Sequence, residues 1–336
     1  MDVAALSSTS PVGRPWRFTG TAMRPQTLLL CKLLFLLAAM HGLPAKLGDP
    51  YLPFLPILDA LREVPGLFAA VLTTAYWVAG VALLFNAWAR SAAVTLGATV
   101  ILALLASKPS FQNHVFIVGC LFLLCGLHRR GEDPWLVRWQ FVLMYFGAGL
   151  NKVLQADWWS GAFLHTWLHD HLANPLYQLG SALLPERWFA AGVSWAVMGS
   201  EVILFTLFLV RRWNRFAVWG VVVVHLGFFA VVGPGPFGYF TEDLLIGLLA
   251  FLAWPRGEQQ LRLREAPARW ARSWLFLLDW DRQLRVGGPP EDGHWLEVRD
   301  GASRYVDLDG LARLIRYSPA FWVALFGAYA LALRIW

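Results

Sequence analysis

The chain has 336 residues, of which 57% are hydrophobic and only 15% are charged, with 19 tryptophans and a formal net charge of +6. A soluble domain carries about 25% charged residues, so this composition excludes an ordinary water-exposed globular fold. The basic residues occur in short clusters between apolar runs, as in the loops of membrane proteins, which argues against a nucleic-acid partner. The sequence therefore predicts an integral membrane protein whose main partner is lipid.

The apolar runs predict the spanning helices. A spanning helix needs about 20 mostly apolar residues. Eight runs approach this length: 27–46, 66–86, 91–107, 113–128, 138–154, 189–210, 214–233 and 238–255. We therefore expect an all-α integral membrane protein, a bundle of about eight transmembrane helices over residues 24–255. Residues 1–23 are polar and lack a signal-peptide cleavage pattern, so we expect them to form a cytoplasmic N-terminal tail.

The composition changes after residue 255. Residues 256–316 are rich in charge and predict a small cytoplasmic α+β C-terminal tail with a few strands and a helix near residues 308–315. Residues 319–336 are apolar again and predict a terminal helix. Its shortness favours an interfacial helix over a ninth spanning helix. Residues 256–336 are thus expected to form a separate small C-terminal domain.

Clusters of arginine indicate the orientation. Basic residues before the first run and between the sixth and seventh runs fall on one side if the N-terminus is cytoplasmic: Arg14, Arg17, Arg24, Arg211, Arg212 and Arg215. Cytoplasmic loops carry the excess of lysine and arginine. We therefore expect a multi-pass protein of the inner or plasma membrane, with its N-terminus and C-terminal tail in the cytoplasm.

Lys152 is the most informative charge, because it closes the fifth apolar run on the expected outer side. A lysine near mid-bilayer costs on the order of 3 kcal/mol, so it usually lies at an interface, lines a cavity or takes part in chemistry. Glu201, inside the sixth run, is a second costly charge, expected to pair with an arginine or to form a hydrogen bond across helices. Residues 155–188 are too polar to span and predict one or two short helices that cap the bundle, either as a lid or as a plain connector.

A group of histidines lies in this capping segment. His165, His169 and His171 have a spacing that occurs in metal sites, with the first pair on one helical face. No cysteine or clear carboxylate pattern accompanies them, so the sequence predicts no metal.

Three short motifs carry a family resemblance. The first runs from Tyr145 to Lys152 and continues to Asp157-Trp158 and Gly161; the others are Gln112-Asn113-His114 and His225-Leu226-Gly227. In this order they resemble the HTTM domain shared with vitamin K-dependent gamma-carboxylases. The resemblance covers roughly residues 20–255.

The resemblance implies a catalytic role for two residues. In the carboxylases the matching lysine deprotonates reduced vitamin K and the histidine supports that step, so Lys152 would be the base and His114 its partner. Asn113, Asp157, Trp158 and His225 would then bind the substrate. The implied cofactor is reduced vitamin K or another quinol. A lysine must be neutral to act as a base, and an apolar quinol reaches such a site most easily from the bilayer.

The chain also departs from the carboxylases. It has Asn151-Lys152 where they have two adjacent lysines, and it lacks their large extracytoplasmic region that grips a protein substrate. The segments 277–281 and 306–311 resemble a degenerate DCC-type thiol oxidoreductase domain, but no cysteine follows Cys125. The leading hypothesis is a carboxylase-like membrane enzyme. The alternative is a non-catalytic HTTM protein that serves maturation or export of a small peptide, or scaffolds a membrane partner protein.

Overall fold

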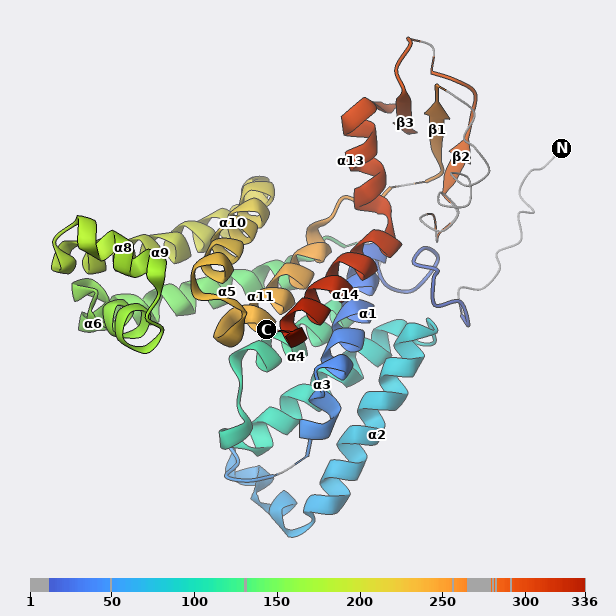
Figure 1. Ribbon diagram of the computed structural model, residues 1–336. Helices are drawn as coiled ribbons and strands as arrows, with labels where there is room; N and C mark the ends of the chain where they lie inside the picture. Colours follow the sequence, from blue (N-terminus) through green and yellow to red (C-terminus); the bar gives the residue numbers. More distant parts are fainter. Residues whose placement is uncertain are drawn as a thin grey trace.

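The computed structural model shows a mostly helical protein with a small sheet near its C-terminal end (Figure 1). It describes residues 12–48, 50–129, 132–255, 257–264, 279, 281, 283–290 and 292–335. The sequence resembling a DCC domain falls partly on Leu277, Leu278 and Trp280, which lie outside the described residues.

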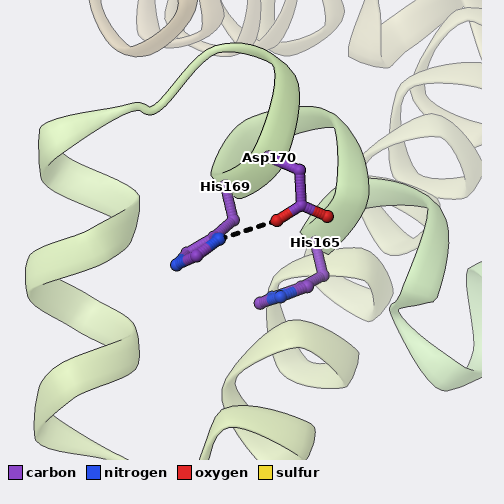
Figure 2. A group of neighbouring side chains, drawn as sticks. All are labelled: His165, His169 and Asp170. Carbon is purple, nitrogen blue, oxygen red and sulfur yellow. Dashed lines mark hydrogen bonds and ion pairs between the residues drawn. The ribbon is translucent and has the colours of Figure 1, made fainter.

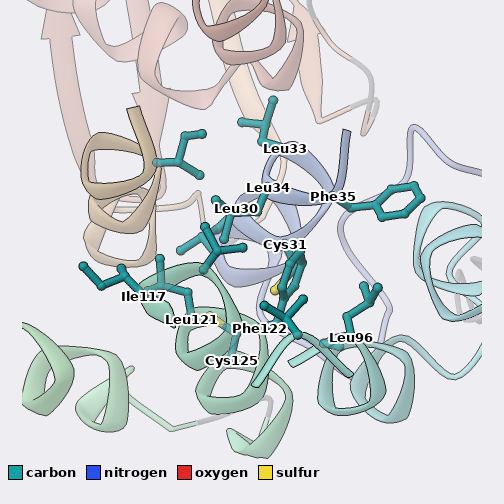
Figure 3. Close-up of a cluster of buried hydrophobic side chains, with 14 of the residues drawn as sticks. Leu30, Cys31, Leu33, Leu34, Phe35, Leu96, Ile117, Leu121, Phe122 and Cys125 are labelled. Carbon is teal, nitrogen blue, oxygen red and sulfur yellow. The ribbon is translucent and has the colours of Figure 1, made fainter. Parts of the chain in front are cut away.

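The first four long helices form one bundle. They are α1 (Pro25–Met40), α2 (Pro65–Leu84), α3 (Ala89–Ala106) and α4 (Asn113–Leu127), with short 3-10 turns η1 (Leu43–Lys46), η2 (Pro56–Glu63) and η3 (Lys108–Ser110) between them. Leucine, phenylalanine and cysteine side chains of α1, α3 and α4 interlock in the core (Figure 3). A Cβ on Gly97 of α3 would lie 2.5 Å from the backbone nitrogen of Leu123. Glycine therefore allows α3 and α4 to pack with their backbones nearly in contact.

A second helical group follows in sequence. It comprises α5 (Trp135–Val153), α9 (Glu186–Leu209), α10 (Asn214–Val232) and α11 (Pro234–Gly247), with the turns η5 (Arg211–Trp213) and η6 (Leu248–Phe251). Figure 1 shows α5, α9 and α10 extending to one side of α1–α4. Helix α11 packs on both groups, because it contacts α4 and α1 as well as α10.

A cap of short helices covers the far end of α5 and α9. It consists of α6 (Ala156–Ser160), α7 (Ala162–His165), the π-helical turn η4 (Thr166–His171) and α8 (Pro175–Leu183). The cap packs against α9 through a small core: Trp158, Leu164, Leu168 and Tyr177 of the cap with Met198 of α9. The Asn174 side chain accepts a hydrogen bond from the Tyr177 amide at the start of α8. The segment is therefore a folded cap, as predicted, but it contains the helices α6, α7 and α8 and the turn η4 in place of the expected one or two helices.

The C-terminal domain contains the predicted strands. The sheet order is β2-β1-β3-β4, formed by β1 (Gln259–Leu263), β2 (Leu284–Val286), β3 (Leu296–Asp300) and β4 (Ser303–Val306). Strands β1 and β2 are parallel, and the other two pairs are antiparallel. Helix α13 (Asp307–Tyr317) packs on β3 and β4. The predicted α+β tail with a helix near residues 308–315 is present.

The terminal helix α14 (Pro319–Ile335) packs against α1 and α11. It is bent by 74° from α13. Ala330 and Phe326 are buried against the bundle, and Arg334 donates a hydrogen bond to the carbonyl of Met40 at the end of α1. These contacts favour a helix that joins the bundle over the expected interfacial position.

Helices occupy all eight predicted ranges, but only four of the described helices are long and apolar enough to cross a bilayer: α2, α3, α9 and the segment Arg211–Val232. A fifth is added if α13 and α14 count as one bent span. Helices α1 and α4 are apolar but shorter, α11 has 14 residues, and α5 carries Arg138 and Lys152. Eight spanning helices are therefore not confirmed. Ile203 (59% exposed) and Val223 (69% exposed) show that the spans present apolar outer faces suited to lipid.

Candidate functional site

Lys152 and Glu201 form an ion pair between α5 and α9. The Lys152 Nζ donates a hydrogen bond to Glu201 Oε1 at 3.0 Å, and it lies 3.4 Å from the carbonyl oxygen of Ala148 one turn back. Both side chains are mostly buried, at 16% and 14% exposure. Glu201 Oε2 is buried and has no hydrogen-bond partner among the described residues. The pair therefore cancels two costly charges and leaves one carboxylate oxygen available.

Gly149 lets the two helices approach at this point. A Cβ on Gly149 would lie 3.3 Å from Glu201 Cβ, closer than an ordinary contact. The small residue one turn before Lys152 thus brings the backbone of α5 close enough for the lysine to reach the glutamate.

A second polar pair lies in the same region. The Tyr145 hydroxyl and His225 Nε2, from α5 and α10, are hydrogen-bonded at 2.9 Å, and both residues are buried. Lys152 lies within electrostatic range of His225, and Glu201 within range of Tyr145. His225 Nδ1 is buried without a hydrogen-bond partner in the described structure. We call Tyr145, Lys152, Trp158, Glu201 and His225 the lysine cluster.

Trp158 closes the lysine cluster from the cap. The Lys152 Nζ lies 5.2 Å from the centroid of its ring, a distance that permits a cation–π contact. Ser194 of α9 donates a hydrogen bond to the Trp158 carbonyl and holds α6 in place. The neighbouring Asp157 is exposed in the first turn of α6, and no side chain caps that helix. Of this dipeptide, the structure brings Trp158 into the cluster and leaves Asp157 on the surface.

The structure places His114 and Asn113 in a different region. His114 lies in the first turn of α4 and lines a cavity of about 250 Å³ together with His41, Lys46, Tyr239 and Asp243. Its ring stacks on that of Tyr239, with centroids 6.2 Å apart. Asn113 is exposed at the start of the same helix.

The expected partnership of Lys152 with His114 is therefore not formed. The lysine amine is drawn to the Glu201 carboxylate on α9, whereas His114 faces α11 and the end of α1. Glu201 takes the position beside the lysine that the resemblance suggests for a histidine.

Two adjacent acids of α11, Glu242 and Asp243, are buried, and Asp243 lines the cavity beside His114. Neither was among the expected site residues. Glu242 is fully buried and accepts from or donates to His41 Nε2 at 2.7 Å, depending on the tautomer and protonation state. Its Oε1 is buried without a partner in the described structure, and the adjacent Asp243 is also buried. Two neighbouring carboxylates within the apolar run 238–255 are costly in a membrane, and this signal is visible in the sequence.

A family model for the HTTM domain matches residues 133–252. This segment, 120 of the 336 residues, is similar to the HTTM domain. It contains α5 to α11 and therefore every member of the lysine cluster, together with Glu242 and Asp243. Helices α1–α4, with His41 and His114, lie outside the matched residues. Searches of curated proteins and of solved structures each found no match to the chain.

Proposed function

We propose that the chain is a carboxylase-related HTTM membrane enzyme that removes a proton from a lipid-soluble acid such as a quinol, with Lys152 as the base. The observation that supports this most directly is the Lys152–Glu201 pair inside the HTTM domain, mostly buried and 3.0 Å apart. Multi-pass insertion with the N-terminus and the tail in the cytoplasm is part of the proposal, based on the arginine clusters.

The ion pair provides a way for Lys152 to hold a neutral amine, the form that can accept a proton. An ammonium cannot accept a proton, and a base must lose its proton to a nearby acceptor first. Glu201 Oε1 is within hydrogen-bonding distance of Nζ, so the proton can move from nitrogen to oxygen without a water bridge. A neutral pair also avoids the cost of holding two separated charges away from water. The neutral amine of Lys152 then takes the proton of the substrate hydroxyl.

The surroundings fit a ring-shaped apolar substrate. Trp158 and the stacked rings of Tyr145, Phe141 and Phe208 provide flat apolar surfaces around the lysine cluster. The unpartnered Glu201 Oε2 and His225 Nδ1 provide polar atoms for substrate oxygens. A bound quinol, as reduced vitamin K or a related molecule, would supply the acidic hydroxyl and a ring for oxygen chemistry. In this proposal Lys152 and Glu201 move the proton, His225 and Tyr145 orient the substrate, and Trp158 excludes water.

The test is quinol turnover by the purified protein in lipid nanodiscs, with reduced vitamin K, oxygen and carbon dioxide, measured by chromatography with and without a glutamate-containing peptide. Lys152→Ala is expected to abolish turnover, a loss of at least about 100-fold for a general base. Lys108→Ala is the matched control, because Lys108 is an exposed lysine outside the cluster. Full activity of well-folded Lys152→Ala would exclude Lys152 as the base.

The ion pair also supports a second candidate, the non-catalytic HTTM protein. A complete pair between α5 and α9 is a sufficient reason for both charges to be present, and it requires no substrate. In that case the protein would hold a small peptide or a membrane partner, and substitution of Lys152 and Glu201 together by methionine and leucine would leave peptide maturation or export unchanged. Loss of that cellular function in the folded double variant would count against this candidate.

A further inference from the structure

The cap carries a compact group of metal-ligand residues, separate from the lysine cluster. His165, His169 and Asp170 each offer one ligand atom, and these atoms all lie within 4.8 Å of one another. Figure 2 shows the two imidazole rings and the carboxylate turned toward the same space. The rings are stacked with centroids 4.8 Å apart, and His169 Nδ1 lies 2.9 Å from Asp170 Oδ1.

A fourth ligand comes from another helix. Glu186, the first residue of α9, places its Oε1 3.2 Å from His165 Nε2. The other ring nitrogen of His165 lies 3.3 Å from the Tyr177 hydroxyl on α8. A metal-binding histidine typically has a partner of this kind on its second nitrogen, which fixes the ring orientation. Side chains of η4, α8 and α9 thus converge on His165.

The backbone conformation of the cap places His165, His169 and Asp170 on the same side. Residues Thr166–His171 form a π-helical turn, a local widening that is frequent at functional sites. It leaves His165 and His169 stacked and turns the adjacent Asp170 to the same side.

We propose that His165, His169, Asp170 and Glu186 bind one divalent transition-metal ion of the Zn²⁺ class. Two imidazoles and two carboxylates are ligands that Zn²⁺ accepts, and the carboxylates supply two negative charges to match the ion. Ligand atoms at about 2.1 Å from a tetrahedral ion are about 3.4 Å apart, so the group must contract on binding. His169 and Asp170 have the freedom to do so, with side chains 43% and 54% exposed.

The ion would tie the π-helical turn to the first turn of α9. The π-helical turn contributes Leu168 to the cap core, where it packs in one cluster with Leu164, Tyr177 and Trp158. Trp158 in turn contacts Lys152. A metal at this position is therefore a clamp that holds the cap over the lysine cluster, and it needs no catalytic role.

The experiment measures metal binding by the full-length protein in detergent, with the affinity tag removed. Titration with Zn²⁺ against a competing chelator is expected to show one tight equivalent, and Co²⁺ is expected to give the visible absorption of a four-coordinate site. His169→Ala and Glu186→Gln are each expected to weaken Zn²⁺ binding at least tenfold, since loss of even an indirect partner commonly does so. Glu186 is 67% exposed, so its substitution preserves folding.

His171→Ala is the matched control, because His171 ends the same π-helical turn but is not part of the ligand group. It is expected to retain the wild-type affinity. Zn²⁺ should also raise the thermal unfolding midpoint of the wild type and of His171→Ala but not that of Glu186→Gln. The proposal would be overturned if the wild type bound no stoichiometric Zn²⁺, or if His171→Ala and His169→Ala lost Zn²⁺ affinity equally. Neither outcome depends on quinol turnover.

Discussion

At the scale of single residues, the cost of a charge in an apolar bundle explains where the polar groups are. Lys152 and Glu201 come from different helices and meet at 3.0 Å. Glu242 meets His41 at 2.7 Å in the same way. In both pairs, the partner from another segment of the chain offsets part of the free-energy cost of removing the charged group from water. Two buried atoms of the lysine cluster, Glu201 Oε2 and His225 Nδ1, have no hydrogen-bond partner among the described residues.

The first prediction concerns the coupling of Lys152 and Glu201. Lys152→Met alone leaves a buried carboxylate unpaired and is expected to lower the free energy of unfolding by about 3 kcal/mol, and Glu201→Leu alone should cost a similar amount. The double variant should be close to the wild type, because no unpaired charge remains. Denaturant titration in mixed micelles measures all four proteins. Additive losses in the double variant would show that the two charges do not stabilise each other.

At the scale of elements, small residues determine which helices can touch. Gly97 brings α3 onto α4, and Gly149 brings α5 onto α9 beside the ion pair. Helix propensity disfavours glycine by about 1 kcal/mol relative to alanine, so a glycine inside a helix needs a packing reason of this kind. Gly147 has open space around its Cβ position and therefore provides a direct comparison on the same helix.

The second prediction uses this pair of glycines. Gly149→Leu forces α5 away from Glu201 and is expected to cost about 1–3 kcal/mol of unfolding free energy through overpacking. Gly147→Ala is expected to leave stability unchanged or raise it by up to about 1 kcal/mol. Both variants are compared in the same unfolding assay. Equal effects of the two substitutions would mean that the close approach of α5 and α9 is unimportant for stability.

The third prediction concerns the C-terminal sheet and pH. A hydrogen bond with His294 lowers the pKa of Asp307, with further hydrogen bonds from the amides of Trp295 and Leu296. A carboxyl whose pKa is lower in the folded state stabilises that state above its unfolded pKa, and this contribution is lost as pH falls through about 4 toward the folded value. Hydrogen exchange of peptides covering β3, corrected for the intrinsic pH effect, should therefore accelerate below about pH 4.

Asp307→Asn should remove most of this pH dependence and leave β3 less protected at neutral pH. Asp309→Asn is the control, because Asp309 is exposed in the first turn of the same helix, α13. An unchanged pH profile in Asp307→Asn would contradict the assignment to this carboxyl.

At the scale of the whole molecule, the pattern of apolar and charged residues predicted where the helices and strands lie better than which of them contact one another. A helix lies in each of the eight apolar runs, although only four of the described helices are long and apolar enough to span a bilayer, and the change in charge after residue 255 identified the small sheet domain. The fact that Lys152 meets Glu201 instead of His114 depends on how α5 turns toward α9. Periodicity along one chain does not show which face of a helix meets which neighbour. The cost of burying Glu201 predicted that it has a partner but did not identify Lys152 as that partner.

The contact between the N-terminal segment and the C-terminal domain leads to the fourth prediction. The amides of Phe18 and Thr19 both donate hydrogen bonds to Asp281 Oδ1, at 2.7 and 3.2 Å, so the N-terminal segment is bound to the C-terminal domain. Helix α1 then runs for 16 residues, about 24 Å, before η1 and the exposed Lys46. Trp16 and Gly288, both exposed, should therefore lie on one side of the membrane and Lys46 on the other.

Cysteine substitutions at these three positions test the arrangement with a membrane-impermeant maleimide in sealed vesicles of known orientation. Trp16→Cys and Gly288→Cys are expected to react from the same side, and Lys46→Cys only from the opposite side. The wild type is the background control, since its free thiols Cys31 and Cys125 are buried and Cys120 is partly buried. The positive-inside rule adds that the shared side is cytoplasmic. Labelling of Trp16→Cys and Gly288→Cys from different sides would contradict the docking of the N-terminal segment on the C-terminal domain. Labelling of Lys46→Cys from their side would show that α1, the shortest of the first three helices, does not cross the bilayer.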